Sequence, residues 1–125
     1  MVEIKKNIVL VGGGGHCISV IDIIENGNEF NILGILDSNS KENNLLGYKI
    51  LGGDNLIPEL VNENTYFLIT VGQIKNYSIR KNIAKTLIEN NAKLATVISC
   101  LAYVSRHAFI EQGTVIMNHA VINAK

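Results

Sequence analysis

Hydrophobic positions in the first hundred residues alternate between short apolar runs and longer stretches with helical spacing. The apolar runs predict strands at 8–11, 32–36, 49–51, 66–71 and 94–98, and the spaced stretches predict helices at 16–26, at 54–60 and from 76 or 78 to about 90. On the first helix, Asp22 and Glu25 belong to one narrow polar stripe, and the other side chains, Ile18 among them, are expected to be buried. This alternation predicts an α/β fold with a Rossmann-like, doubly wound parallel sheet of about four main strands.

A six-residue period replaces this pattern after about residue 101, with aliphatic residues at one phase and small residues at another. The two sets are Val104, Ile110, Ile116 and Ile122, and Ala102, Ala108, Thr114 and Ala120. This period is typical of a left-handed parallel β-helix, in which each hexapeptide forms one side of a triangular coil. We therefore expect a sheet domain at 1–101, followed at 102–125 by the first coil of an incomplete hexapeptide-repeat β-helix.

A single coil does not bury its own hydrophobic face, and its open strand edges tend to pair with other chains. We therefore expect residues 1–100 to be the stably folded unit. Residues after about 101 are expected to be disordered, domain-swapped or packed on a neighbour.

Composition excludes several classes of partner. The chain has 11 basic and 11 acidic residues and a formal net charge of zero, so no nucleic-acid partner and no polybasic membrane contact are expected. The apolar run at 8–11 is too short for a signal peptide or a membrane span, which predicts a cytoplasmic protein with no membrane insertion. Cys17 and Cys100 have neither zinc-site spacing nor a disulfide framework, so we expect apolar packing groups and no metal site.

Four consecutive glycines, Gly12, Gly13, Gly14 and Gly15, join the first predicted strand to the first predicted helix, directly before His16. Without side chains, successive backbone N–H groups can face a ligand, and the helix start adds a partial positive charge. Such a loop lies at the carboxyl edge of an α/β sheet, where ligands bind. It therefore predicts a cradle for a phosphate or diphosphate, with His16 donating to a phosphate oxygen. The alternative is a tight turn followed by an exposed histidine.

Two other predicted strands end at the same edge, one before Asp37 and one at Gly72. An acidic residue at Asp37 suits the ribose of NAD or the ribose or base of a uridine nucleotide, and the alternative is a loop cap. Cys17 occupies the third glycine place of the dinucleotide fingerprint, which makes NAD the weaker interpretation. Arg80 on the following helix is predicted either to face the ligand or to pair with a local carboxylate.

Several motifs in chain order carry a family resemblance. They are the loop Gly14-Gly15-His16, Asp37, Val71-Gly72, Arg80, and the segments 96–98, 102–105, 113–117 and 120–124. Together they resemble the PglD/NeuD-type sugar O/N-acetyltransferases of the left-handed β-helix superfamily. That family includes the bacillosamine-pathway and sialic-acid acetyltransferases of bacterial surface-glycan biosynthesis. The resemblance covers essentially the whole chain, as the N-terminal part of such a protein.

The resemblance implies that this region binds a nucleotide-linked sugar of the UDP-sugar or CMP-sialic acid type. The substrate-binding residues carried over are Gly12, Gly13, Gly14, Gly15, His16, Asp37, Ser38 and Gly72. It also implies acetyl-CoA as acyl donor, bound mostly beyond this chain, and a homotrimer for a complete member.

The family's catalytic histidine is expected about one coil beyond Lys125, so no catalytic residue is assigned and the chain is expected to be inactive alone. His107 and His119 have no acidic neighbour in sequence and are expected at outward corners of the coil. Two further functions stay open. An NAD(P)-dependent oxidoreductase fragment predicts that NADH stabilises the fold, and a non-catalytic nucleotide-binding or assembly module predicts trimers without ligand dependence.

Overall fold

The computed structural model describes residues 5–72 and 77–124, which contain one central six-stranded sheet in the order β3-β4-β2-β1-β5-β6. Its strands are β1 (Lys6–Val11), β2 (Phe30–Leu36), β3 (Asn44–Leu45), β4 (Tyr48–Gly52), β5 (Thr65–Ile69) and β6 (Lys93–Leu94). Neighbouring strands are parallel except in the β3–β4 hairpin. The order runs outward from β1 in both directions, which confirms the doubly wound α/β prediction.

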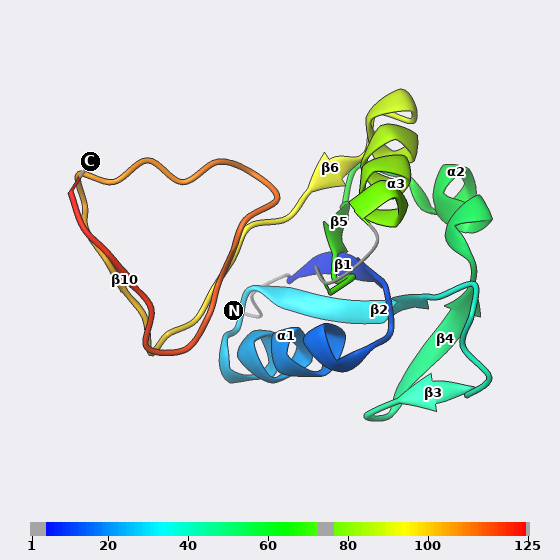
Figure 1. Cartoon of the computed structure of the whole chain (residues 1–125), viewed down its shortest axis with the longest axis horizontal. Coiled ribbons are helices and arrows are strands. Elements are labelled where there is room, and N and C mark those ends of the chain that lie inside the picture. The colour runs from blue at the N-terminus through cyan, green and yellow to red at the C-terminus, as the bar shows by residue number, and fades with distance from the viewer. Residues whose placement is uncertain (1–4, 73–76, 125) are drawn as a thin grey trace.

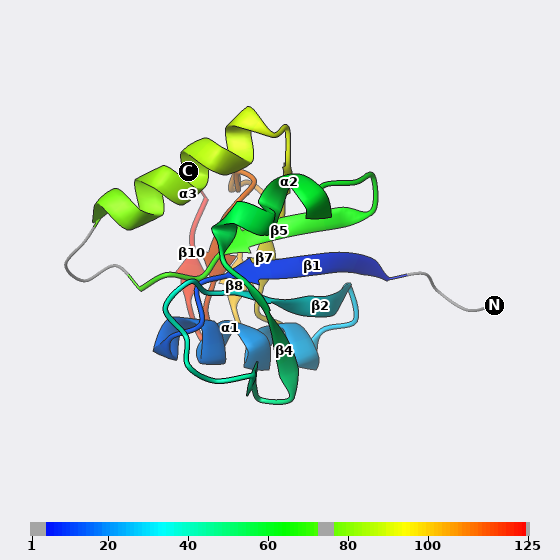
Figure 2. The same cartoon turned by 90° about the vertical axis from the view of Figure 1, so that its right-hand side faces the viewer.

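Helices cover both faces of the sheet (Figures 1 and 2). One face is covered by α1 (Gly15–Asn26), and the other by α2 (Ile57–Leu60), which follows the 3₁₀ turn η1 (Asp54–Leu56), and by α3 (Tyr77–Glu89). Alternate residues of β1 point into two separate hydrophobic clusters, one per face, because successive strand side chains point to opposite sides. In the described residues no helix is both long enough and apolar enough to span a membrane.

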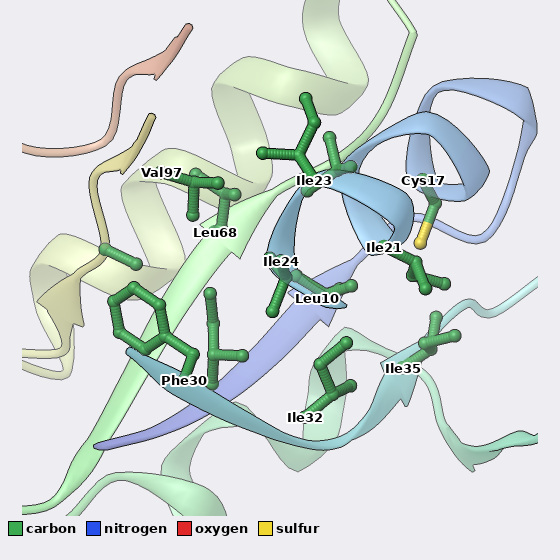
Figure 3. Packing of buried hydrophobic residues seen from close by; sticks show 13 residues of the cluster. Leu10, Cys17, Ile21, Ile23, Ile24, Phe30, Ile32, Ile35, Leu68 and Val97 are labelled. Atoms are coloured by element: carbon green, nitrogen blue, oxygen red, sulfur yellow. The ribbon is translucent and has the colours of Figure 1, made fainter. Parts of the chain in front are cut away.

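The cluster under α1 is the larger of the two (Figure 3). Figure 3 labels Leu10, Cys17, Ile21, Ile23, Ile24, Phe30, Ile32, Ile35, Leu68 and Val97 in it. The prediction that Ile18 is buried is wrong, since its side chain is 42% exposed. Ile18 lies four and seven positions before Asp22 and Glu25, so helical geometry places it on the exposed stripe of α1.

The chain beyond the sheet forms a triangular coil (Figure 1). Its strands are β7 (Val97–Ile98), β8 (Tyr103–Val104), β9 (Val115–Ile116) and β10 (Val121–Ile122). Val97 pairs in parallel with Val115, and Tyr103 with Val121, so partners are eighteen residues apart, which is three hexapeptides. This spacing agrees with the predicted β-helix coil.

The predicted strand at 94–98 is wrong, because it divides into β6 of the sheet and β7 of the coil. Long-range pairing decides the break: β6 pairs with β5, whereas β7 pairs with β9. Val97 is 4% exposed and packs in the α1 cluster, so the coil shares a hydrophobic core with the sheet. At the start of α3, Ser78 lies inside the helix, and the other predicted cap, Asn76, is outside the described residues.

Candidate functional site

A cleft of about 620 Å³ lies between the carboxyl edge of the sheet and the coil. Its lining includes His16 from the start of α1, Gly72 after β5, Arg80 from α3, and Gly113, Thr114 and Met117 from the coil. The volume falls within the range of about 300–1,000 Å³ that is usual for small-molecule sites. The predicted residues His16 and Gly72 are therefore brought together across the cleft.

The glycines of the loop have different environments. Gly12 has φ +119°, and a Cβ there would lie 2.8 Å from the backbone nitrogen of Val71, so the fold itself requires glycine at this position. A Cβ on Gly14 or Gly15 would meet no atom within 4 Å. No side chain caps the first turn of α1, where Gly14 is the N-cap. The N–H groups of that turn are therefore available to an anion, as the phosphate-cradle prediction requires.

Asp37 connects the glycine loop to the loop that follows β2. The backbone N–H of Gly13 donates to its Oδ2 at 3.0 Å, and the N–H of Asn39 donates to its Oδ1 at 2.9 Å. Asp37 therefore does cap the loop that follows β2, which does not exclude ligand binding. Each carboxylate oxygen still has acceptor capacity for a ligand, so binding by Asp37 stays a prediction.

Ser38 and Asp37 line a second, smaller cavity of about 80 Å³. The Ser38 hydroxyl donates to Oδ1 of Asp54 at 3.3 Å, and Asp54 lines the same cavity. Gly12 also lines it, whereas Val71 lines both this cavity and the larger cleft. The two cavities therefore adjoin at Val71. Of the predicted site residues, Gly12, Asp37 and Ser38 line the smaller one, His16 and Gly72 line the larger one, and Gly13, Gly14 and Gly15 line neither.

Arg80 is half-buried in the cleft, and its Nη1 donates to the carbonyl oxygen of Val71 at 3.4 Å. Among the described residues no carboxylate lies within 4.0 Å of its guanidinium, and the ion pair that they form is Lys85–Glu89 on the outside of α3. The alternative that Arg80 pairs with a local carboxylate is therefore wrong for this part of the chain. Its place in the cleft agrees with the other alternative, that it faces the ligand.

Cys17 is a packing group beneath the glycine loop, as predicted, and its side chain is fully buried. The same prediction is wrong for Cys100, which is exposed at a turn of the coil. Burial is the main cause that raises the pKa of the Cys17 thiol; a hydrogen bond with Thr70 lowers it, and the charge of Asp37 raises it. Thr70 in turn donates to the carbonyl oxygen of Gly12 at 2.6 Å. Cys17 and Thr70 therefore support the glycine loop from the core side. A protonated, buried thiol is a poor nucleophile, so Cys17 has a packing role.

The histidines of the coil lie away from the cleft. Both His107 and His119 are exposed, and His119 has φ +62°, a left-handed conformation typical of a tight corner. This agrees with their predicted place at outward corners. Across 5–72 and 77–124, no group of three or more His, Cys, Asp or Glu side chains is placed to hold a metal ion.

Sequence reasoning did not find the coil residues Gly113, Thr114 and Met117 that line the cleft. The available signal was the register of the repeat. Gly113 lies eighteen residues after Ala95 and donates its N–H to the Ala95 carbonyl at 3.0 Å. Because Ala95 directly follows β6 at the carboxyl edge, this register brings the segment after Gly113 to the site.

Comparison with known proteins assigns the family. Residues 7–87 match the PglD N-terminal domain. A UDP-N-acetylbacillosamine N-acetyltransferase from Bacillus subtilis (strain 168) is 33% identical over 114 residues, which cover 90% of this chain and 51% of the relative. The chain therefore spans about half the length of this curated relative.

Solved structures agree with this assignment. The acetyltransferase domain of PglB from Neisseria gonorrhoeae FA1090, in complex with acetyl coenzyme A, is 28% identical with a TM-score of 0.84, over 96% of this chain and 57% of that one. PerB from Caulobacter crescentus, in complex with CoA and GDP-perosamine, shares the fold at 24% identity with a TM-score of 0.80, over 94% and 54% of the two chains. On these matches, the chain belongs to the PglD N-terminal domain family.

Proposed function

We propose that this chain is the nucleotide-sugar-binding region of an acetyl-CoA-dependent sugar O/N-acetyltransferase of bacterial surface-glycan biosynthesis. The observation that carries the proposal is the cleft at the carboxyl edge, where His16 from the uncapped first turn of α1 and Gly72 face residues of the coil. Family membership supports it, as does the relative named a UDP-N-acetylbacillosamine N-acetyltransferase.

In the proposed arrangement the nucleoside lies by the smaller cavity, against Asp37 and Ser38. The diphosphate lies over Gly14 and Gly15, where no side chain obstructs the N–H groups of α1, and His16 donates to one of its oxygens. The sugar then extends into the larger cleft toward the coil. Acceptor oxygens at Asp37 and Ser38 match the hydroxyl and N–H donors of a nucleoside, and the N–H donors of α1 match the oxygens of the adjoining diphosphate.

Acetyl-CoA is the proposed acyl donor, supported by the neighbours that were solved with acetyl-CoA or CoA. The coil residues that line the cleft, Gly113, Thr114, Val115 and Met117, include no cation for the phosphates of CoA. We therefore place the acetyl-CoA site mostly outside this chain. The transfer reaction belongs to the longer protein, and this chain binds without turnover.

We also propose that the longer protein is a cytoplasmic homotrimer that assembles through its β-helix. The exposed apolar side chains on the outside of the coil support this: Tyr103 is 59%, Phe109 85% and Val121 62% exposed. Both cysteines, Cys17 and Cys100, are free thiols, as is usual in a reducing compartment.

The experiment is a thermal-shift screen followed by calorimetry, with UDP, UDP-N-acetylglucosamine, CMP-sialic acid, NAD and acetyl-CoA. A ligand that binds the native state alone raises the apparent stability by about 2.7 kcal/mol at one hundred times its Kd. We expect a shift with a sugar nucleotide and none with acetyl-CoA. A shift with NAD alone would favour an oxidoreductase fragment. No binding at millimolar sugar nucleotide would leave the assembly module as the better interpretation.

A further inference from the structure

A second helix, α3, also begins at the carboxyl edge and brings a cation into the cleft. Arg80 is the fourth residue of α3, and no acidic side chain stands in the first turn of this helix. The partial positive charge of a helix N-terminus disfavours a cation and favours an anion. Arg80 is half-buried there and lines the cleft, so this local repulsion is incompletely screened by water.

The guanidinium of Arg80 has N–H donors that are not engaged by the described residues. It has five N–H donors, and the described residues engage it through the 3.4 Å bond from Nη1 to the Val71 carbonyl oxygen. The acidic groups nearest the site are used elsewhere: the carboxylate of Asp37 accepts two backbone N–H groups, and that of Asp54 accepts the Ser38 hydroxyl. Because no carboxylate of the described residues lies within 4.0 Å of Arg80, an anionic ligand would supply a direct charged partner.

The charges of the two adjoining cavities have opposite sign. The smaller cavity is lined by Asp37 and Asp54, whereas the described lining of the larger cleft holds His16 and Arg80 and no carboxylate. Figure 2 shows α1 and α3 on opposite faces of the sheet, so the helices that carry His16 and Arg80 reach its edge from opposite sides. Gly72 and Val71 line the larger cleft together with His16 and Arg80, and Val71 also lines the smaller cavity.

We infer that Arg80 is a diphosphate-binding residue, holding the phosphates of the nucleotide sugar from the α3 side while the start of α1 holds them from the other. This rests on the proposed function and adds a residue to that site. It also fixes the direction of the ligand, with the nucleoside at Asp37 and the sugar beyond Arg80, toward the coil. A planar guanidinium suits this role because it binds two phosphate oxygens at once.

The test is calorimetric titration of the 125-residue chain and its Arg80→Met variant with uridine, UMP, UDP, UDP-N-acetylglucosamine and inorganic pyrophosphate. Loss of a charge-assisted bidentate contact is expected to weaken UDP and UDP-N-acetylglucosamine by about 10- to 100-fold. Uridine affinity should not change. The affinity of Arg80→Lys for UDP should lie between those of the wild-type protein and Arg80→Met, because lysine keeps the charge but loses the bidentate geometry of the guanidinium. The matched control is Lys81→Met, which removes a charge from the next residue of α3, outside the cleft.

Each outcome decides between distinct claims. If wild-type protein binds UDP-N-acetylglucosamine and Arg80→Met binds it equally well, this inference is wrong and the proposed function stands. If Lys81→Met loses as much affinity as Arg80→Met, net charge is the cause and Arg80 is not a ligand contact. If wild-type protein binds pyrophosphate alone, Arg80 belongs to a simple anion site and the nucleotide-sugar function fails. If Arg80→Met lowers the Tm, its loss of affinity could come from unfolding, and the Arg80→Lys variant then provides the test. Wild-type affinity in a folded Arg80→Lys protein would contradict the bidentate contact.

Discussion

The backbone N–H of Gly13 donates a 3.0 Å hydrogen bond to Oδ2 of Asp37, twenty-four residues later in the chain. Through its other oxygen, Asp37 accepts the N–H of Asn39 at 2.9 Å. The carboxylate thus fixes the glycine loop against the loop after β2. These loops carry the proposed diphosphate and nucleoside subsites, so a single side chain sets the spacing between the two.

A double-mutant cycle tests this connection. Asp37→Ala removes the acceptor of two backbone N–H groups, and we expect the free energy of unfolding to fall by about 1–3 kcal/mol. Gly13→Ala should destabilise the wild-type protein, because the new Cβ would lie 2.9 Å from Oδ2 of Asp37. In the Asp37→Ala background that clash is absent, so Gly13→Ala should cost much less there. Urea unfolding measures the cycle, and strictly additive effects would contradict the coupling.

Gly12 and Gly15 should separate the structural from the binding role of the glycine loop. Gly12→Ala forces a side chain into φ +119° and against Val71, so we expect a loss of more than about 2 kcal/mol in unfolding free energy. Gly15 is the first residue of α1 and has open space around it, so Gly15→Ala should raise stability by up to about 1 kcal/mol.

The same Gly15→Ala variant should bind UDP less tightly, since its methyl group enters the space proposed for the phosphates. Chemical denaturation of Gly12→Ala and Gly15→Ala measures the change in unfolding free energy, and calorimetry measures the change in UDP affinity. Wild-type UDP affinity in Gly15→Ala would exclude this part of the loop as the phosphate cradle.

Two buried threonines offer a matched pair of substitutions. Thr65 is 1% exposed, and its hydroxyl has no hydrogen-bond partner among the described residues, whereas Thr70 is fully buried and donates to the carbonyl oxygen of Gly12 at 2.6 Å. Valine has nearly the same shape without the hydroxyl. We expect Thr65→Val to stabilise the protein by about 1 kcal/mol and Thr70→Val to destabilise it by about 1–3 kcal/mol. Thermal and urea unfolding compare them, and effects of equal sign would contradict these hydrogen-bond assignments.

The parts of the fold that could be predicted from sequence are those that local patterns determine. The apolar runs and helical spacing in 1–90 have their own period, so the alternating sheet and helices follow from it. The strand predicted at 94–98 fails because its second half pairs with Val115, and no local pattern shows that partner. The prediction that Ile18 is buried fails because its position relative to Asp22 on the helix, and not its hydropathy, decides its exposure.

The candidate site likewise combines features that local sequence patterns predict with features that depend on long-range contacts. Glycines and polar residues at strand ends are visible in the sequence, so His16 and Gly72 could be placed at one edge. The bond from Gly13 to Asp37 depends on side-chain conformation and on the register of β1 against β2, which composition does not encode. Arg80 has two equal interpretations in the sequence, and carboxylate pairing is excluded for the described residues only by the three-dimensional arrangement, which leaves no carboxylate within 4.0 Å of its guanidinium.

The thiol of Cys17 predicts a pH dependence of stability. Burial raises its pKa in the folded protein, so the folded state keeps a proton that the unfolded chain loses above about pH 8.5. The contribution of Cys17 is therefore complete below that pH and is lost as the pH rises toward the folded pKa. We expect the unfolding free energy to fall between about pH 8 and 9.5, and to fall less in Cys17→Ala. Urea unfolding across this range checks it, and equal slopes in the two proteins would contradict it.

Exposure also predicts which cysteine reacts. Cys100 is exposed and Cys17 is fully buried, so a thiol reagent should label Cys100 in the native protein and both residues after unfolding. Mass spectrometry of the labelled peptides distinguishes them. Labelling of native Cys17 at the rate of Cys100 would mean that the core beneath the glycine loop opens readily.

The coil is expected to open before the sheet. Its strand pairs join β7 with β9 and β8 with β10, whereas the third side, around Phe109, has no strand partner among the described residues. The adjacent corner presents Arg106, which is exposed, to trypsin. We therefore expect trypsin to cut after Arg106 before it cuts at the sites within the sheet, which follow Lys6 in β1, Lys49 in β4 and Lys93 in β6. Arg106→Gln should slow the loss of the coil.

Val97 packs under α1 and is 4% exposed, so the fragment that ends at Arg106 should keep the folded sheet and its far-UV circular dichroism. Digestion followed by mass spectrometry identifies the fragments in order of appearance. If the segment 102–124 survives as long as the strands of the sheet, the shared core at Val97 holds the whole coil in place. The expectation that the first hundred residues are the stable unit would then be wrong.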